Sequence, residues 1–449
     1  MKPSAPPKSL ANVHLTGIAR DLAARADAGK PIRIGVIGSG EMGTDLVTQG
    51  ALMRGVEIAA IATRRPHTAR AAMEIAYGDD SMGVECESAG KASAAIGMGK
   101  IAITPADTLV TIPEIDVVID ATGKPGVAAD FCLTAMEHGK HLVMMNVEAD
   151  VTIGPYLKKQ ADRLGVIYSV GAGDEPSSCM ELIEFATALG YRIVSAGKGK
   201  NNPLNHDAVP DDYRAEAIRR NMNPRMLVEF VDGSKTMVEM CAIANATGLV
   251  PDVPGMHGPK ADRDQMVKVL IPKADGGILN KKGVVDFTVG KGVAPGVFVI
   301  VEAEHPRIIE RMDDLHVGIG PYYSFFRPYH LTSLEVPLTA ARIMLYGRPD
   351  MVPLPEPVAE VCAVAKRDLA VGESFDAIGE TCYRSFVMTI GDSRARGALP
   401  VGLLEGGKVT APVKKGDLIT HANAVPDTTT KLFRLRSLQD QMFGLPLNP

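Results

Sequence analysis

The sequence predicts an α/β protein in which a doubly wound parallel sheet is followed by an α+β domain and a small β-rich C-terminal module. Between residues 32 and 170, short apolar stretches alternate with amphipathic stretches of helical length, an order that produces parallel strands joined by helices. Residues 190–340 are rich in Gly, Pro, Asn and Met and contain strand-like runs. From about residue 355, short apolar runs separated by tight turns indicate a β-rich module.

Periodicity and turn residues assign the elements of the first domain. Apolar side chains spaced three to four residues apart predict helices, and continuous short apolar runs predict buried strands. The predicted helices are 11–29, 41–53, 68–77, 127–138 and 153–164, and the predicted strands are 32–37, 57–62, 115–121, 141–146 and 166–170. Further strands are expected at 284–289, 297–302 and 361–365.

These patterns divide the chain into residues 1–172, 173–354 and 355–449. A polar segment rich in Gly, Ala and Lys, residues 78–111, interrupts the first domain. Such an insertion is either a lid or subunit contact, or a surface loop that the fold tolerates. The insertion and the β-rich texture of the later domains favour a homodimer.

Composition excludes several classes of function. The 449 residues carry a net charge of −5, which gives no general attraction to nucleic acid or to an anionic membrane surface. No apolar run reaches the 18 or so residues of a membrane helix, and the N-terminus lacks the apolar core of a secretory signal. The six cysteines show no C-x-x-C spacing, so we expect reduced thiols in a cytoplasmic protein.

A glycine-rich turn follows the first strand. Residues 38–43 read G-x-G-x-x-G, directly between an apolar strand and a helix. Glycines in this order let the backbone approach a pyrophosphate, whose charge meets the helix N-terminus. The sequence therefore predicts a Rossmann domain whose dinucleotide contacts include Gly38, Ser39, Gly40, Glu41, Met42 and Gly43.

The end of the second strand selects the cofactor. An enzyme specific for NAD is expected to carry Asp or Glu there, whereas this chain has Thr63, Arg64 and Arg65. Two guanidinium groups suit a ribose 2′-phosphate, so we expect NADPH; the alternative is a solvated basic turn. Thr122 and Gly123 after the third strand, and Asn146 after the fourth, are expected to complete the cofactor cleft.

Several polar clusters compete for the catalytic roles in the second domain. Hydride transfer to a carbonyl needs a group that polarises the oxygen and a proton donor. Asp174 is either a helix cap or an acid, residues 198–202 form either a solvated turn or an anion-binding loop, and His316 and His330 are either packed histidines or catalytic ones. Carboxylates at 229, 232 and 239 are more typical of a solvated helix face than of a metal site.

Several motifs carry a resemblance that covers nearly the whole chain. The stretches at 34–45, 119–123 and 146–151 resemble the homoserine-dehydrogenase-like oxidoreductases, and those at 365–373, 399–403 and 413–417 resemble a SAF-type module. Together with 197–202 and 316–320, this combination is most similar to the 1-deoxy-D-xylulose-5-phosphate reductoisomerase-like proteins. The chain departs from ordinary reductoisomerases because it lacks a clear Asp-Ser-Glu metal motif, and from homoserine dehydrogenases because residues 198–202 replace their Asn-Gly-Thr-Thr-Asn loop.

The resemblance implies NADPH-dependent reductive isomerisation of the phosphorylated sugar 1-deoxy-D-xylulose 5-phosphate to 2-C-methyl-D-erythritol 4-phosphate, a step of isoprenoid synthesis. A divalent metal, Mg or Mn, usually polarises the oxygens in such reactions. The alternatives are an NAD(P)-dependent dehydrogenase of a homoserine-like or sugar-acid substrate, and a sensor that binds NADPH without turnover.

The expected roles of the site residues follow from this resemblance. Lys198, Lys200, Asn201 and Asn202 are expected to bind the phosphate or an oxyanion. Asp174 and Glu148 are expected to manage protons or a metal, and His316, Arg327 and His330 to close over the substrate.

Overall fold

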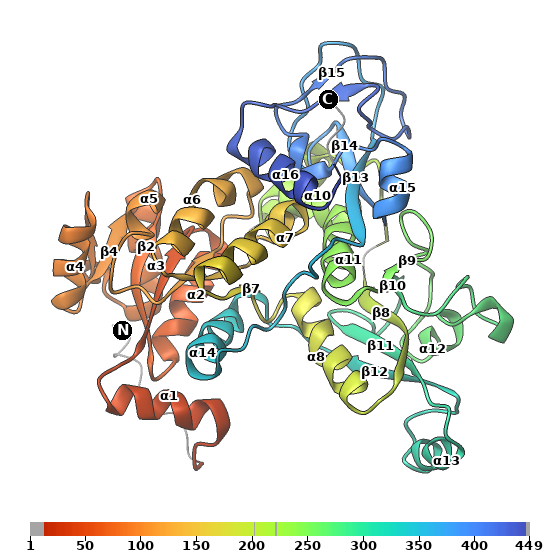
Figure 1. Cartoon of the computed structure of the whole chain (residues 1–449), viewed down its shortest axis with the longest axis horizontal. Coiled ribbons are helices and arrows are strands. Elements are labelled where there is room, and N and C mark those ends of the chain that lie inside the picture. The colour runs from red at the N-terminus through yellow and green to blue at the C-terminus, as the bar shows by residue number, and fades with distance from the viewer. Residues whose placement is uncertain (1–12, 202, 221, 446–449) are drawn as a thin grey trace. The chain divides into compact units, whose positions relative to one another are not determined.

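The computed structural model describes residues 13–201, 203–220 and 222–445, and it comprises two compact units (Figure 1). Unit 1 contains Met1–Asp150, Tyr156–Asp174 and Leu331–Val352; unit 2 contains Val151–Pro155, Glu175–His330 and Pro353–Pro449. The predicted three-part division stays a prediction.

Unit 1 is built on a seven-stranded sheet in the order β3-β4-β2-β1-β5-β6-β7, in which every neighbouring pair is parallel. The strands are β1 (Ile32–Ile37), β2 (Val56–Ala62), β3 (Gly83–Glu85), β4 (Ile101–Thr104), β5 (Val117–Asp120), β6 (His141–Met144) and β7 (Tyr168–Val170). The order reverses between β1 and β5, so the predicted doubly wound fold class is confirmed. Ligands of such sheets bind outside the carboxyl ends of the strands at this reversal.

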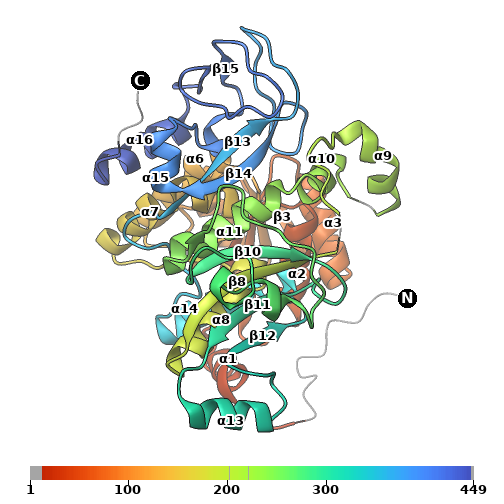
Figure 2. The same ribbon diagram turned by 90° about the vertical axis from the view of Figure 1, so that its right-hand side faces the viewer.

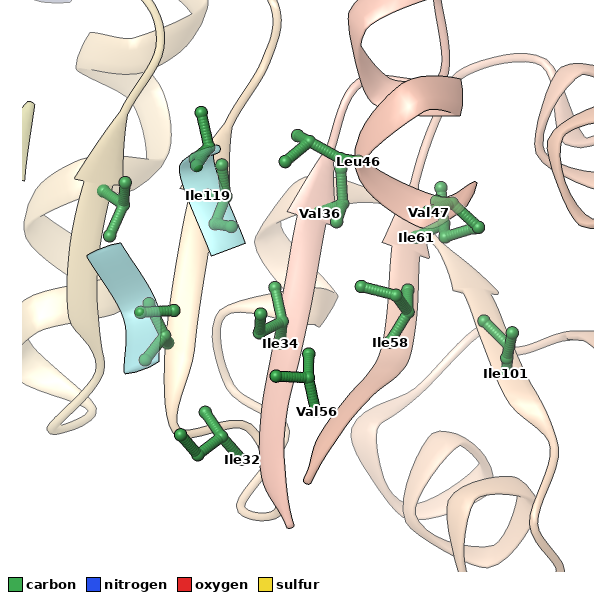
Figure 3. Close-up of a cluster of buried hydrophobic side chains, with 14 of the residues drawn as sticks. Ile32, Ile34, Val36, Leu46, Val47, Val56, Ile58, Ile61, Ile101 and Ile119 are labelled. Carbon is green, nitrogen blue, oxygen red and sulfur yellow. The ribbon is translucent and has the colours of Figure 1, made fainter. Parts of the chain in front are cut away.

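Apolar side chains on the strands form the core of unit 1. Ile32, Ile34 and Val36 of β1 are fully buried and pack with Ile58 of β2 and Ile119 of β5 (Figure 3). The helices are α1 (Gly17–Asp27), α2 (Glu41–Leu52), α3 (Pro66–Tyr77), α4 (Ala89–Gly97), α5 (Ala106–Leu109), α6 (Pro125–Glu137), α7 (Val147–Leu164) and α14 (Val336–Tyr346). Although α14 comes late in the sequence, its buried residues belong to the same core.

The segment 78–111 is not the lid or surface loop that was expected. It contains the 3-10 turn Asp80–Met82, β3, α4, β4 and α5, and its two strands extend the parallel sheet beyond β2. Ile101 and Ile103 are buried in the sheet, which the polar residues around them concealed. The segment is therefore a further part of the fold.

Unit 2 contains a five-stranded mixed sheet in the order β12-β11-β8-β10-β9 (Figure 2). Its strands are β8 (Arg192–Lys200), β9 (Val250–Pro251), β10 (Val284–Val289), β11 (Val297–Glu302) and β12 (Tyr322–Arg327). The helices of this part are α8 (Glu175–Ala188), α9 (Pro210–Arg219), α10 (Pro224–Val231), α11 (Ser234–Thr247), α12 (Met266–Val269) and α13 (Pro306–Asp314).

The glycine-punctuated stretch at 198–202 was expected to be a loop, but Lys198 and Lys200 lie in β8. The flanking glycines permit close packing of the strand rather than a turn. A Cβ on Gly197 would lie 1.7 Å from the carbonyl oxygen of Asp286 in β10, and one on Gly199 would lie 2.0 Å from that of Val293. Only glycine fits at such distances, and the sequence alone could not show this neighbour.

The C-terminal part of unit 2 consists of short paired strands and two helices. The elements are β13 (Ala359–Ala365) paired antiparallel with β14 (Tyr383–Thr389), β15 (Lys408–Val409) paired antiparallel with β16 (Ala424–Val425), α15 (Ile390–Ala395) and α16 (Lys431–Met442). The strand expected at 361–365 lies within β13, whereas the likeness to a SAF-type module stays a prediction. Across the described ranges, every helix is too short or too polar to cross a membrane.

Candidate functional site

The glycine turn after β1 has the backbone geometry that a dinucleotide-binding loop requires. Gly38 has φ +109°, and a Cβ there would lie 2.8 Å from the carbonyl oxygen of Ala121. A Cβ on Gly43 would lie 2.1 Å from the carbonyl oxygen of Gly38, so α2 and the turn touch through their backbones. A Cβ on Gly40 would meet nothing within 4 Å, which leaves open space at the start of α2. These three positions match the roles of the glycines around a pyrophosphate.

The first turn of α2 supports the same interpretation. Its N-cap is Gly40, and no side chain caps the helix, so its first backbone N–H groups are suited to an anionic ligand. Glu41 and Met42 are the first residues of the helix, and the Ser39 hydroxyl lies 2.5 Å from that of Thr68 in α3. The residues present therefore fit the pyrophosphate of a nicotinamide cofactor.

The residues expected to read the ribose lie at the carboxyl end of β2. Arg64 and Arg65 are both exposed there, and Arg65 is the N-cap residue of α3. The hydroxyl of Thr63 accepts a hydrogen bond from the backbone N–H of Arg65 at 3.1 Å, which fixes the turn. Specificity for the 2′-phosphate stays a prediction that this placement supports.

A buried carboxylate that sequence reasoning missed organises the next two strand ends. Asp120, the last residue of β5, accepts hydrogen bonds from the backbone N–H and the hydroxyl of Thr122 at 2.9 and 2.7 Å, and from the Asn146 amide at 3.0 Å. The Asn146 side-chain oxygen in turn caps α7 by accepting from the backbone N–H of Ala149. Burial raises the pKa of Asp120 to about 6. Thr122, Gly123 and Asn146 are expected to contact the cofactor. In the structure, Thr122 and Asn146 stabilise the loop through their hydrogen bonds to Asp120.

The two acids expected to manage protons lie in unit 1. Glu148 is buried in the first turn of α7, and Asp174 is the last residue of the unit 1 segment that precedes α8. Their catalytic assignment stays a prediction.

Unit 2 contains a buried cluster of ionisable groups that we call the lysine–carboxylate cluster, made of Lys198, Glu175, Glu239 and His330. The Nζ of Lys198 contacts Oε1 of Glu175 and Oε2 of Glu239. The same Oε1 of Glu175 lies 3.5 Å from Nε2 of His330. Lys198 is 4% exposed, Glu175 8% and Glu239 0%, so these charges interact with little solvent between them.

Helix and strand positions explain how this cluster forms. Glu175 is the first residue of α8, Glu239 lies in the middle of α11, Lys198 is near the end of β8, and His330 follows β12. Both helices contact β8, and their carboxylates reach the ammonium from two elements. Two buried atoms of the cluster, Oε1 of Glu239 and Nδ1 of His330, have no hydrogen-bond partner within the described ranges.

The pKa shifts of the lysine–carboxylate cluster distinguish a group that keeps its proton from groups that exchange one near neutral pH. Burial disfavours the charged form of Lys198, but Glu175 and Glu239 outweigh it and raise the lysine pKa above its usual value. Burial, followed by the charge of Glu175, raises the pKa of Glu239 to about 7. Burial and the charge of Lys198 lower the pKa of Lys200 to about 8. Lys198 is therefore a permanent cation, while Glu239 exchanges a proton near neutrality.

These contacts bear on the anion-binding role predicted for residues 198–202. The Lys198 ammonium already contacts two carboxylates, and the Lys200 ammonium donates to the carbonyl oxygen of Phe230 at 2.8 Å. Asn201 is exposed beyond the end of β8, and Asn202 lies outside the described residues. The phosphate role stays a prediction.

Strand register separates the three residues that were expected to close over the substrate. Val297 of β11 pairs with both Lys198 of β8 and Arg327 of β12, so Arg327 lies at the same end of the sheet as the cluster, as does His330 three residues later. His316 is exposed in the turn after α13, before β12 begins at the opposite end with Tyr322. Six strand residues, about 17 Å, separate the two ends of β12, and the common role expected for His316 with Arg327 and His330 stays a prediction.

Glu175 and Glu239 are the two functional candidates that sequence reasoning undervalued. Glu239 was assigned to a solvated helix face, yet α11 is apolar around most of its circumference, which is typical of a buried helix. A lone carboxylate inside such a helix needs a buried partner. That signal could have found Glu239, but not its pairing with Lys198.

Family comparisons place both sites in matched regions. Residues 34–171 match the model described as homoserine dehydrogenase, NAD binding domain, and residues 173–336 match the one described as oxidoreductase DRL, catalytic domain. The first range contains the glycine turn, and the second contains the whole lysine–carboxylate cluster. The chain therefore carries a homoserine-dehydrogenase-like NAD-binding domain and a DRL catalytic domain, and it is an NAD(P)-dependent oxidoreductase. No curated protein matches it.

Solved structures show only distant similarity. A probable dehydrogenase from Thermotoga maritima is 14% identical with a TM-score of 0.41, over 71% of this chain and 90% of that one. Scyllo-inositol dehydrogenase from Lactobacillus casei, with bound NAD(H) and scyllo-inositol, is 14% identical with a TM-score of 0.36, over 66% and 76%. The 1-deoxy-D-xylulose 5-phosphate reductoisomerase from Zymomonas mobilis, in complex with NADPH, is 13% identical with a TM-score of 0.33, over 47% and 56%.

Proposed function

We propose that this chain is an NADPH-dependent dehydrogenase that interconverts a carbonyl and an alcohol on a small carboxylated substrate of homoserine-like or sugar-acid type. The observation that carries the proposal is the buried Lys198 ammonium held between Glu175 and Glu239, with His330 beside Glu175. A fixed cation next to proton-exchanging groups is what carbonyl reduction needs.

The nicotinamide cofactor, when bound, supplies the hydride. Backbone groups of Gly38 and Gly40 would hold its pyrophosphate, and Arg64 and Arg65 support the choice of NADPH because two guanidinium groups can neutralise a ribose 2′-phosphate.

The substrate oxygen is the atom on which the cluster would act. As the carbonyl carbon accepts the hydride, negative charge develops on that oxygen, and a hydrogen bond from the Lys198 ammonium stabilises it. Because Glu175 and Glu239 raise the lysine pKa, Lys198 keeps its proton near neutrality and polarises rather than protonates. The proton that completes the alcohol then comes through Glu175 and His330, which lie 3.5 Å apart.

The charge balance of the cluster favours this proposal over reductive isomerisation of a phosphorylated sugar. Two carboxylates already neutralise Lys198, so little positive charge is left for a phosphate dianion. A divalent metal stays a prediction, and the Lys198 ammonium already contacts Oε1 of Glu175.

The test is NADPH oxidation by the purified protein, followed at the nicotinamide absorbance band. Aspartate semialdehyde and 1-deoxy-D-xylulose 5-phosphate, each with and without Mg²⁺, separate the two reactions. Turnover of a carboxylated carbonyl, lost in Lys198→Met and retained in the exposed control Lys159→Met, is the expected result. Turnover of the phosphorylated sugar alone would contradict the proposal and favour the reductoisomerase.

A further inference from the structure

The guanidinium of Arg327 lies in the same row of the sheet as Lys198, and the proposed reaction does not use it. Lys198, Val297 and Arg327 occupy one row across β8, β11 and β12. Directly paired residues on neighbouring strands project from the same face, and two strand spacings separate the backbones of Lys198 and Arg327 by about 10 Å. Two long side chains on one face at this separation can hold the two ends of a small molecule.

Contacts to α8 confirm that both side chains project toward the same helix. Lys198 contacts Glu175, and Nη1 of Arg327 donates to the hydroxyl of Ser178 at 2.8 Å and lies 3.2 Å from Oε2 of Glu181. Glu175, Ser178 and Glu181 are three residues apart, so they share one face of α8. The side chain of Arg327 is 12% exposed, and its guanidinium carbon lies 4.7 Å from the ring centre of Tyr329, which orients the planar group.

The acidic partner of Arg327 is one that a ligand can replace. The side chain of Glu181 is 46% exposed, whereas the side chains of Glu175 and Glu239 are only 10% and 0% exposed. A substrate carboxylate that displaces Glu181 exchanges one carboxylate for another at the same guanidinium. The displaced side chain returns to water, so the exchange leaves no buried charge unpaired.

The charge count selects a carboxylate rather than a phosphate. Glu181 supplies one negative charge at Arg327, while Glu175 and Glu239 already contact Lys198. Release of Glu181 to solvent makes room for one negative charge, while a phosphate monoester carries nearly two.

We propose that Arg327 is the specificity-determining residue that binds the carboxylate of a small oxo or hydroxy acid whose carbonyl or hydroxyl faces Lys198. This inference rests on the proposed function and adds the residue that recognises the acid group. Ser178 positions the guanidinium, and Glu181 occupies it until the substrate arrives.

The experiment compares Arg327→Lys with the control Arg192→Lys, an exposed arginine at the other end of β8. The substrates are succinic semialdehyde, which carries a carboxylate, and butanal, which has the same chain length without one. Arg327→Lys is expected to raise KM for succinic semialdehyde by 10-fold or more, with kcat changed less than 3-fold, and to leave butanal kinetics unchanged. Equal KM for both aldehydes in wild type, or an unchanged KM in Arg327→Lys, overturns the inference.

A binding measurement keeps the inference separate from the proposed function. If wild type reduces neither aldehyde, the proposed function fails for these substrates, and calorimetry with succinate and with inorganic phosphate then decides the inference. Succinate binding that weakens at least 10-fold in Arg327→Lys and not in Arg192→Lys supports it. Binding of phosphate but not succinate, binding of neither, or equal succinate affinity in all three proteins overturns it.

Discussion

Replacement of Glu239 by Gln tests the electrostatics of the lysine–carboxylate cluster most directly. The substitution keeps the shape of the side chain and removes one ionisable group from α11. The ionisable groups around it are Lys198 and Lys200 from β8, Glu175 from α8 and Lys235 from its own helix, and His330 lies 3.5 Å from Glu175. Because the group is fully buried, its ionisation is coupled to folding.

The sign of the effect follows from the direction of the shift. Burial raises the pKa of Glu239 from 4.5 to about 7, so the folded chain binds this proton more tightly than the unfolded chain does. The stability contribution of this group is therefore fully present below about pH 4.5 and is lost as the pH rises toward 7. At about 1.4 kcal/mol per pKa unit, wild type loses up to about 3 kcal/mol over this window that Glu239→Gln cannot lose.

The assay is urea unfolding of the full chain at pH 5 and pH 8, followed by circular dichroism. We expect the stability of Glu239→Gln relative to wild type to increase by about 2–3 kcal/mol between the two pH values, with only the transition of unit 2 affected. Glu184→Gln, an exposed carboxylate on α8, should show the same difference at both pH values. If Glu239→Gln behaves like this control, Glu239 titrates like an ordinary carboxylate and the reasoning is refuted.

Three further predictions concern the backbone and the cofactor. Changing both Arg64 and Arg65 to Ala should weaken NADPH binding 10-fold or more by calorimetry, since charge-assisted hydrogen bonds contribute about 1.5–3 kcal/mol each, and should leave NADH binding unchanged. Gly43→Ala places a methyl group 2.1 Å from the carbonyl oxygen of Gly38, so its affinity for NADPH and for NADH should fall by at least 10-fold. Gly40→Ala, where a methyl group meets nothing within 4 Å, should fold normally. Gly197→Ala places its methyl group 1.7 Å from a carbonyl oxygen in β10 and should lower the unfolding free energy of unit 2 by about 2 kcal/mol or more. The control is Gly190→Ala, where φ is positive but nothing lies within 4 Å, so that it measures backbone strain without a clash.

Much of unit 1 could be predicted because its local and global patterns agree. The strand expected at 32–37 is β1, and the strand expected at 57–62 differs from β2 only by Val56, since each run is mostly apolar and is bounded by Gly or polar turns. The segment 78–111 was missed because β3 and β4 have only three and four residues, too short for a period to emerge.

The candidate site was less predictable because its residues meet through tertiary contacts. The glycine-rich surroundings of Lys198 mark it as a candidate, but the same glycines predict a loop, whereas the structure has a strand. Gly197 is instead required by the closeness of Asp286 in β10, and Gly199 by that of Val293, both about 90 residues later in the chain. Glu239 and Lys198 likewise come from elements whose approach no local pattern encodes.

The same logic explains why Lys198 is suited to polarise an oxygen. An isolated ammonium buried to 4% exposure would lose its proton rather than keep its charge, because the desolvation of a cation is costly. Two carboxylates reverse this, because their charges raise the pKa of Lys198 above its usual value. The pairing of one lysine with two acids keeps the ammonium both charged and buried. The same two ion pairs therefore make the burial of Lys198 tolerable and keep it charged for the proposed reaction, so that loss of Glu175 or Glu239 should affect both stability and activity.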